Sequence, residues 1–245
     1  MARQRLVIGR QAERSAAIAA VDNVLGGGYR LVQVSGEPGI GKTRMLSWLA
    51  GYARTRDLPV LSGSAAEFET DVPFGPLTEA LAGPLAEQRT ELRDRLSDER
   101  YRLAGTVFPA LAVAGGGRDD LRDSERYRLH RALRSLLAAI TPPTGLVLCL
   151  DDLHWADAAT CDFLAHLLRQ PPRAPLLLAL SYRPRQLPAR LADTLRTTAS
   201  TQLALAPLSR SETEVLAGVD VGSRRGARLF RASGGNPLYT ELLAS

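Results

Sequence analysis

The stretch SGEPGIGKT, residues 35–43, constrains this chain more than any other part of its sequence. It matches the pattern G-x-x-x-x-G-K-[ST], with Gly36 and Gly41 as the glycines and Lys42 and Thr43 at its end. A short apolar run of strand type precedes it, and the residues that follow have the apolar spacing of a helix. The sequence therefore predicts a phosphate-binding loop between a strand and a helix.

The chemistry of phosphate binding explains this spacing. Glycines allow backbone conformations in which successive N–H groups of the loop point toward an anion. The loop leads into a helix N-terminus, where free N–H groups and the helix dipole also favour negative charge. Lys42 is expected to reach the β- and γ-phosphates of a nucleotide, and the hydroxyl of Thr43 is expected to ligate Mg²⁺.

Lys42 is the only lysine in the chain, which has 30 arginines. An ammonium on a flexible stem and a planar guanidinium bind phosphate in different geometries, so the two residues are not interchangeable at such a site. A composition that uses arginine everywhere else therefore indicates that position 42 needs lysine for its chemistry.

The composition narrows the function classes. The net charge of +5 is modest, and basic residues alternate with acidic ones, as in ELRDRLSDERYRL at residues 91–103. Such runs are typical of solvated helix faces, and neither a helix-turn-helix nor a basic stripe for nucleic acid is evident. No signal peptide and no apolar run of membrane-spanning length is evident. The cysteines, Cys149 and Cys161, are expected to be buried thiols of a cytoplasmic protein.

A second chemical feature follows the apolar run at residues 146–150, where Asp151 and Asp152 stand side by side. A continuous apolar run predicts a central parallel strand, and ligands of such sheets bind at the carboxyl ends of the strands. Asp151 is expected to hold the Mg²⁺ shell, and Asp152 to orient or deprotonate the attacking water. The alternative is that the pair forms a capping turn before the helix near Asp157. His154 allows two interpretations, a sensor of the γ-phosphate or a residue that packs the turn.

A third chemical feature follows the apolar run at residues 176–180, which is expected to be another buried strand. Arg183 comes just after it, and a cation at this tip would lie beside the γ-phosphate. We therefore expect Arg183 to be a catalytic sensor residue, and the alternative is a surface or interface arginine. Arg44, next to the loop, is expected either to touch phosphate or to cap its helix. His130 and His166 fall in helical stretches and are expected on helix surfaces.

The order of the elements predicts an α/β fold. Strand candidates alternate with helical segments, which favours a doubly wound, mostly parallel sheet with helices on both faces. The five candidates lie at residues 31–34, 59–65, 146–150, 176–180 and 201–208. The last of them is expected to be an exposed edge. A helical insertion is expected at about 77–140, with a break at 112–120.

The two ends of the chain predict further elements. Residues 6–10 have strand character and precede an amphipathic helix, which GGG at 26–28 should close. Ser209 and Glu212 have the spacing of a capping box, which marks the start of a helix. The short helices after residue 207 are expected to form a lid.

The motifs of the chain, taken in order, resemble those of the signal-transduction ATPases with numerous domains (STAND). The segments that carry the resemblance are VIGRQAE, GEPGIGKTR, DVPFGPL, LCLDDLHWAD, SYRP and GGNPLY. The chain is most similar to the nucleotide-binding region of the large ATP-binding LuxR-type (MalT-like) transcriptional regulators. The resemblance runs from about Leu6 to Leu243, which is nearly the whole chain.

The resemblance implies a P-loop NTPase fold of the ASCE, AAA-like kind, with a five-stranded parallel sheet in the order 5-1-4-3-2. It implies a nucleotide-binding domain over 1–206, the beginning of a helical lid domain over 207–245, and ATP or ADP with Mg²⁺ as cofactors. The loop residues that it implies for nucleotide binding are Gly36, Glu37, Pro38, Gly39, Ile40, Gly41, Lys42, Thr43 and Arg44. The residues that it implies for the adenine pocket are Val7, Ile8, Gly9 and Arg10, a VGR-type segment with an inserted Ile, and Pro237 from the lid.

The function that the resemblance implies is an ATP/ADP-dependent switch that hydrolyses ATP slowly and regulates transcription. Such proteins rest in a closed state with ADP, open on ATP exchange and an inducer, and often self-associate. Their sensor repeats and DNA-binding domain are expected to lie outside this chain, so DNA contact is expected only through such a domain. Two other classes stay open: an AAA-type ATPase or P-loop kinase, and a nucleotide-binding scaffold that binds protein partners through residues 77–140.

Overall fold

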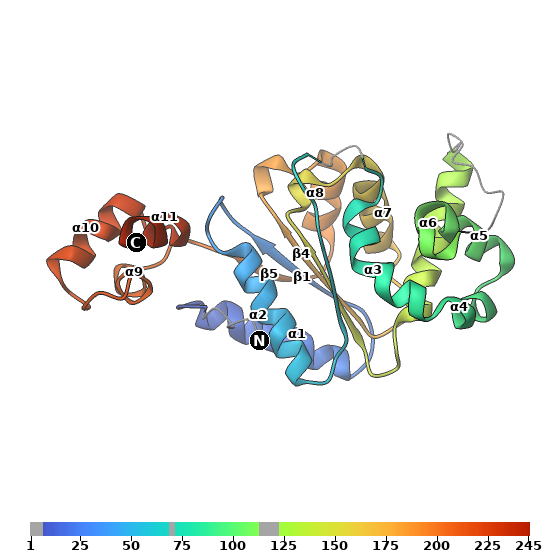
Figure 1. Cartoon of the computed structure of the whole chain (residues 1–245), viewed down its shortest axis with the longest axis horizontal. Coiled ribbons are helices and arrows are strands. Elements are labelled where there is room, and N and C mark those ends of the chain that lie inside the picture. Colours follow the sequence, from blue (N-terminus) through green and yellow to red (C-terminus); the bar gives the residue numbers. More distant parts are fainter. Residues whose placement is uncertain (1–6, 69–71, 113–122) are drawn as a thin grey trace.

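A computed structural model describes residues 7–68, 72–112 and 123–245, and its centre is a five-stranded sheet (Figure 1). The strands are β1 (Arg30–Ser35), β2 (Val60–Ser64), β3 (Leu146–Asp151), β4 (Leu176–Tyr182) and β5 (Thr201–Ala204). They lie in the order β2-β3-β4-β1-β5, and each neighbouring pair is parallel. This confirms the expected order 5-1-4-3-2, which is the same order read from the other edge.

Helices cover both faces of the sheet. Helices α1 (Gln11–Leu25) and α2 (Lys42–Thr55) pack on one face. Helices α3 (Gly75–Glu87), α7 (Ala158–Arg169) and α8 (Ala189–Thr197) pack on the other. The central strands β3 and β4 are buried along almost their whole length. This explains their continuous apolar sequence, because a strand that is covered on both faces needs no polar side chains.

A helical insertion connects β2 to β3; its first helix lies over the sheet beside α7, and its later helices lie at the end of the molecule opposite the C-terminus (Figure 1). It consists of α3, α4 (Arg89–Arg95), α5 (Asp98–Val107), a 3₁₀ turn at Pro109–Leu111 and α6 (Asp123–Ile140). Helix α3 passes so close to β2 that a Cβ atom on Gly63 would lie 1.9 Å from the carbonyl oxygen of Pro76. The break expected at 112–120 lies outside the described residues except for Ala112.

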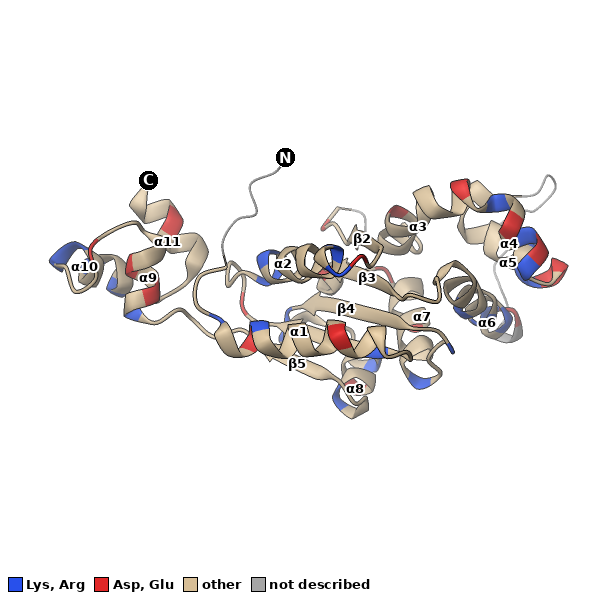
Figure 2. Cartoon of the chain, turned by 90° about the horizontal axis from the view of Figure 1, so that it is seen from below, with Lys and Arg blue, Asp and Glu red and all other residues tan. Residues whose placement is uncertain are grey.

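Three short helices follow β5 and lie at the other end of the molecule (Figure 1); residues 207–245, which contain them, are called the lid below. They are α9 (Arg210–Leu216), α10 (Arg224–Ser233) and α11 (Pro237–Ala244). The expected capping box at Ser209 and Glu212 is present, with both reciprocal hydrogen bonds formed. Contrary to the expectation from the sequence, one basic stripe exists: α10 contains no acidic residue and exposes its arginines (Figure 2). These are Arg224, Arg225, Arg228 and Arg231.

Two expectations about local structure are wrong. Residues 7–10 form no strand, because Gly9 and Arg10 both have positive φ angles, 65° and 61°, which a strand cannot contain. His166 is buried and His130 is half-buried, because α6 packs on α7 and brings the two imidazole centroids to 5.3 Å from each other. Both cysteines are buried free thiols, as expected. Among the described residues, no helix has the length and apolar character to cross a membrane.

Candidate nucleotide-binding site

The loop between β1 and α2 has the backbone geometry that the glycine pattern predicts. Gly39 and Gly41 have positive φ angles of 73° and 102°, which are costly for other residues, and Gly41 is the residue that caps the N-terminus of α2. A Cβ atom on Gly36 would lie 2.8 Å from Cγ2 of Ile40 and 2.9 Å from the carbonyl oxygen of Leu205, just after β5. The loop is thus held in one curled shape, packed against the end of the neighbouring strand.

Lys42 is buried, and its ammonium lies over the loop itself. Its Nζ atom donates hydrogen bonds to the carbonyl oxygens of Gly36, at 3.2 Å, and Glu37, at 3.1 Å. Burial lowers the pKa of Lys42, and the negative charge of Asp152 opposes that shift. The chain therefore holds the ammonium of its only lysine against the backbone of the loop, where a nucleotide phosphate would bind.

The carboxylate of Asp151 ties together the tips of β3 and β4. Its Oδ1 atom accepts hydrogen bonds from the Ser181 hydroxyl and, at 3.0 Å, from the backbone N–H of Asp152. The Ser181 hydroxyl in turn accepts a second bond from that N–H, also at 3.0 Å. Sequence reasoning did not single out Ser181, although one signal was available: it is the first polar residue after four leucines and an alanine in β4.

Asp152 leaves the strand in a different direction from Asp151. It has a positive φ angle of 51° and begins the 3₁₀ turn Leu153–Trp155. Burial and, secondly, the charge of Asp151 raise the pKa of Asp152, while Lys42 and Arg183 act in the opposite direction. The pair does not cap α7, whose N-cap is another aspartate, Asp157; the side chain of Asp157 accepts the Thr160 N–H at 2.8 Å.

His154 and Arg183 flank the carboxylate of Asp152. The side chain of His154 has no exposed surface, and its Nδ1 atom lies 3.8 Å from Oδ1 of Asp152. Burial, then the positive charges of Arg183 and Lys42, lower the pKa of His154 to about 4, so the imidazole is neutral at pH 7. The guanidinium of Arg183 lies 5.8 Å from the ring centroid of Trp155 and donates to Gln186 at 3.2 Å.

A cavity of about 910 Å³ joins most of the expected phosphate-side residues. Its lining includes Lys42, Thr43, Asp152, Arg183 and, from the lid, Pro237. A neighbouring cavity of about 190 Å³ joins Thr43 to Asp151 between α2 and the ends of β2 and β3. The structure thus places both expected Mg²⁺ ligands together, on the lining of one cavity at the same strand edge.

The expected adenine-side residues also meet, but in a small space. Val7, Ile8 and Arg10 line a cavity of about 30 Å³ together with Pro237. That is far below the roughly 300–1,000 Å³ of ordinary ligand pockets, so a purine ring does not fit there without movement of the lid. Gly9 does not line this cavity and faces Glu212, whose Oε1 atom would lie 1.9 Å from a Cβ atom on Gly9.

The lid contacts the phosphate-binding loop directly, through the two residues on either side of Pro237. The side-chain amide of Asn236 donates to the carbonyl oxygen of Pro38 at 2.9 Å, and the N–H of Leu238 donates to that of Gly39 at 3.2 Å. The guanidinium of Arg44 lines the large cavity and pairs with Glu241 of α11 at 2.8 Å. Two glycine-rich motifs of the chain are thereby joined across 198 positions of sequence.

Comparisons with solved structures give the fold. The chain is similar to a single-residue mutant of RuvB from Thermotoga maritima, with TM-score 0.52 and 13% identity over 98% of this chain and 63% of that chain. It is similar to AMPPCP-bound DnaA from Aquifex aeolicus, with TM-score 0.51 and 14% identity over 98% of this chain and 62% of that chain. A STAND protein with a tetratricopeptide repeat sensor, PH0952 from Pyrococcus horikoshii, matches with TM-score 0.50 and 17% identity over 98% of this chain and 30% of that chain.

Comparisons of sequence give the family. The uncharacterized protein R02095 of Rhizobium meliloti (strain 1021) is 28% identical over 256 positions, which cover 90% of this chain and 23% of that protein. The chain thus spans less than a quarter of this curated relative. The family described as the AAA ATPase domain matches residues 6–179, which include the phosphate-binding loop and the two aspartates that end β3. Because that match covers well over half of the chain, the protein belongs to the AAA ATPase domain family.

Proposed function

We propose that this chain is an ATP/ADP-dependent switch module of the STAND type that hydrolyses ATP slowly. The observation that carries the proposal is the contact between the lid and the backbone of the phosphate-binding loop at Pro38 and Gly39. The carbonyl groups of Pro38 and Gly39 hold the lid, and they belong to the same loop whose N–H groups would bind a phosphate. Phosphate binding and lid position therefore depend on the same few peptide groups.

The roles of the site residues follow from their positions. Lys42 and the loop N–H groups bind the phosphates, and Thr43 and Asp151 hold Mg²⁺, which neutralises phosphate charge. Asp152 orients or deprotonates the attacking water, and Arg183 senses the γ-phosphate from the tip of β4. Three observations support these roles. The loop is curled, the ammonium of Lys42 is bonded to the loop backbone, and Asp152 lines the cavity.

The resting state of the switch is closed, with ADP bound. The nucleotide-binding domain is residues 1–206, with the insertion at about 77–140, and the lid begins at 207. The adenine lies between residues 7–10 and Pro237, so the lid of the ADP-bound closed state lies far enough from residues 7–10 to widen the 30 Å³ cavity seen here. ATP exchange with an inducer releases the lid and allows self-association.

The larger protein, on this proposal, is a cytoplasmic LuxR-type regulator of transcription. The support is the order of motifs in the sequence, together with a curated relative of which this chain covers only 23%. DNA contact belongs to a separate C-terminal domain. The exposed arginines of α10 provide a check: a gel shift by this chain alone at moderate salt would contradict the assignment of DNA binding to another domain.

One experiment separates the switch from its rivals. Protein purified without added nucleotide is denatured, and the released ligand is identified by chromatography. The same preparation is assayed for ATP hydrolysis beside the Asp152→Asn variant. Retained ADP with turnover on the order of a few per hour, as in unstimulated switch GTPases, supports the proposal. An empty site with rapid, Asp152-dependent turnover would instead support a working AAA-type ATPase, and failure to bind any nucleotide would support a scaffold.

A further inference from the structure

We propose that His154 is a positioning residue, which donates a hydrogen bond from Nδ1 to the carboxylate of Asp152 and so fixes the direction in which that carboxylate faces the attacking water. The proposal rests on the proposed function, because it assigns the hydrolytic role to Asp152. It chooses between the two interpretations that the sequence left open for His154, a phosphate sensor or simple packing of the turn.

The first observation is the number of unpartnered polar atoms at this turn. Six buried side-chain nitrogen or oxygen atoms lack a hydrogen-bond partner in the described part of the chain, and three of them lie here. They are Nδ1 and Nε2 of His154 and Nε of Arg183. A neutral imidazole has one donor and one acceptor, and buried polar groups nearly always have partners in folded proteins. An imidazole with neither nitrogen bonded is therefore held ready for a partner that approaches when the site is in use.

The second observation is the position of the nearest candidate partner. Oδ1 of Asp152 lies 3.8 Å from Nδ1 of His154, which is beyond hydrogen-bond range by less than about 1 Å. The backbone of Asp152 is already fixed, because its N–H is bonded to Asp151 and Ser181. Its carboxylate makes no hydrogen bond within the described residues, so on this proposal the side chain rotates to close the gap to Nδ1. The carboxylate would then be held by its neighbour rather than by solvent.

His166 shows that burial of a histidine does not by itself imply this role. It also has an unpartnered Nε2 atom, but its ring packs edge-on against Tyr127, at 5.7 Å, and beside His130, at 5.3 Å. These contacts hold α6 against α7. No carboxylate of the cavity lining belongs to this cluster. His166 is therefore a matched control, because it is a second buried imidazole whose loss should affect packing alone.

The kinetic test uses single-turnover hydrolysis of Mg·ATP by four proteins: wild type, His154→Phe, His154→Asn and His166→Phe. We expect His154→Phe to lower the hydrolysis rate about 10- to 100-fold, the effect of a misdirected catalytic group, with the Kd for Mg·ATP within about twofold of wild type. His154→Asn should recover part of the rate, because its amide nitrogen lies near the place of Nδ1. His166→Phe should hydrolyse ATP at the wild-type rate.

The double variant His154→Phe/Asp152→Asn tests whether the two residues act as a unit. If His154 acts through Asp152, the double variant hydrolyses ATP no more slowly than Asp152→Asn alone. The proposal would be overturned if His154→Phe lowered the hydrolysis rate by the same factor in wild type and in Asp152→Asn. A full wild-type rate in His154→Phe would also overturn it. Neither result would affect the proposed function, which depends on nucleotide binding and on the Asp152→Asn variant.

A measurement without turnover provides the second readout. The chain has only three histidines, so the imidazole NMR signals are assigned from the His154 and His166 variants. On addition of Mg·AMPPCP, the His154 ring should adopt the tautomer protonated at Nδ1 in the wild type and not in Asp152→Ala. An unchanged His154 signal, or the same change in both proteins, would overturn the proposal.

Discussion

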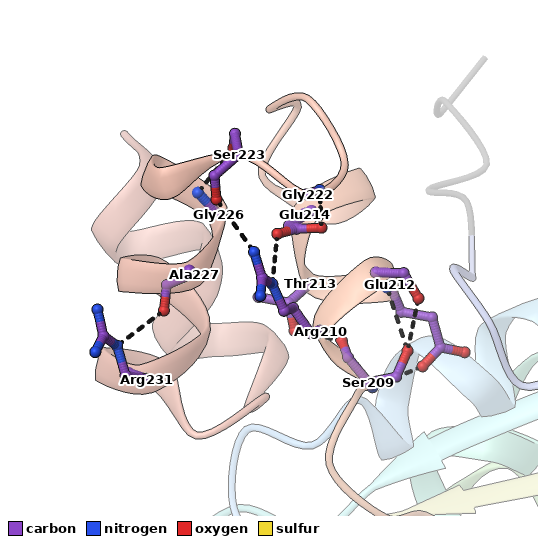
Figure 3. Close-up of polar contacts among 11 residues, drawn as sticks. Ser209, Arg210, Glu212, Thr213, Glu214, Gly222, Ser223, Gly226, Ala227 and Arg231 are labelled. Carbon is purple, nitrogen blue, oxygen red and sulfur yellow. Dashed lines mark hydrogen bonds and ion pairs between the residues drawn. The ribbon is translucent and has the colours of Figure 1, made fainter.

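Two carboxylates, a buried one in the lid and a half-buried one at the tip of β3, lie in opposite kinds of environment. In the lid, Glu214 is 1% exposed, and both of its oxygens are bonded: Oε1 to Arg210 and Oε2 to the N–H of Gly222, each at 2.9 Å (Figure 3). At β3, no hydrogen bond to the carboxylate of Asp152 occurs within the described residues, and Nδ1 of His154 lies 3.8 Å from its Oδ1 atom.

The pKa shifts of the two groups have opposite signs for that reason. The hydrogen bond from Gly222, then that from Arg210, lowers the pKa of Glu214. Burial, then the charge of Asp151, raises the pKa of Asp152. Hydrogen bonds stabilise the charged form of a carboxylate, whereas burial and a like charge destabilise it. The difference shows how a site can be distinguished from a structural network: the lid satisfies its buried charge internally, and the strand tip leaves polar groups available to a ligand.

Of the changes that test this comparison, Asp152→Asn should have the largest effect on a measured rate. We expect hydrolysis of Mg·ATP to fall about 10²- to 10⁴-fold, the usual contribution of a general base, with nucleotide affinity nearly unchanged. Glu214→Gln is the matched control, a buried carboxylate outside the site, and should keep the hydrolysis rate. Hydrolysis and the Kd for nucleotide are measured on each variant. Equal turnover in wild type and Asp152→Asn would remove the distinction between the two environments.

Lys42→Ala should weaken Mg·ATP binding about 100-fold or more. The expected loss is that of two charge-assisted hydrogen bonds to phosphate. Isothermal titration with Mg·ATP measures it, and Arg54→Ala, which alters another cation in the lining of the same cavity, serves as the control. Lys42→Arg should also lose binding, because a planar guanidinium does not fit where the ammonium lies between the carbonyls of Gly36 and Glu37. Wild-type affinity in Lys42→Ala would contradict the assignment of the loop.

Gly226→Ala should destabilise the lid. A Cβ atom on Gly226 would lie 2.4 Å from Cγ and Oε1 of Glu214, so either α10 or the glutamate must move. Overpacking of this kind costs about 1–3 kcal/mol. Chemical denaturation and hydrogen exchange of α9 and α10 measure the change. Gly83→Ala in α3 is the control, because nothing lies within 4 Å of its added Cβ atom. Equal stability of both variants would mean that the Glu214 network tolerates displacement.

Asn236→Ala should loosen the lid from the loop. The variant loses the hydrogen bond to Pro38 and the cap of α11, in which the Asn236 side chain accepts the N–H of Leu238 at 3.0 Å. Each contributes about 1 kcal/mol, so we expect nucleotide release to become several-fold faster. Stopped-flow displacement of a fluorescent ADP analogue measures the rate. Glu241→Ala, which removes only a partly exposed ion pair with Arg44, should change the release rate less.

The pH dependence of lid stability should give the smallest signal. Because the folded pKa of Glu214 is lowered, its contribution to stability is present above the ordinary glutamate value of 4.5 and is lost as the pH falls below that value. Urea denaturation of wild type and Glu214→Gln should therefore differ more at pH 7 than at pH 4 or below. A difference that stays constant with pH would show that the two hydrogen bonds to Glu214 do not depend on its charge.

Much of the fold was predictable because its signals are local. The leucine runs of β3 and β4, the glycines at 36, 39 and 41, and the capping box at Ser209 each depend on a few adjacent residues. The errors arose where packing decided the outcome. Residues 7–10 have strand composition, but two left-handed residues bend the chain there, and Gly9 packs against Glu212 of α9. His166 lies on the side of α7 that α6 covers, and the sequence does not show which side of α7 another helix will cover.

The sequence by itself determined the phosphate-binding loop, the carboxylates at the end of a buried strand, and the order of the sheet through the family resemblance. These depend on the conformations that glycine permits and on the continuous burial of parallel strands. The tertiary structure alone decided that Arg44 pairs with Glu241, that Asn236 bonds to the loop, and that Ser181 bonds to Asp151. The physical reason is distance along the chain: contacts such as that between Pro38 and Asn236, 198 positions apart, are set by how helices and strands pack, and no local pattern records them.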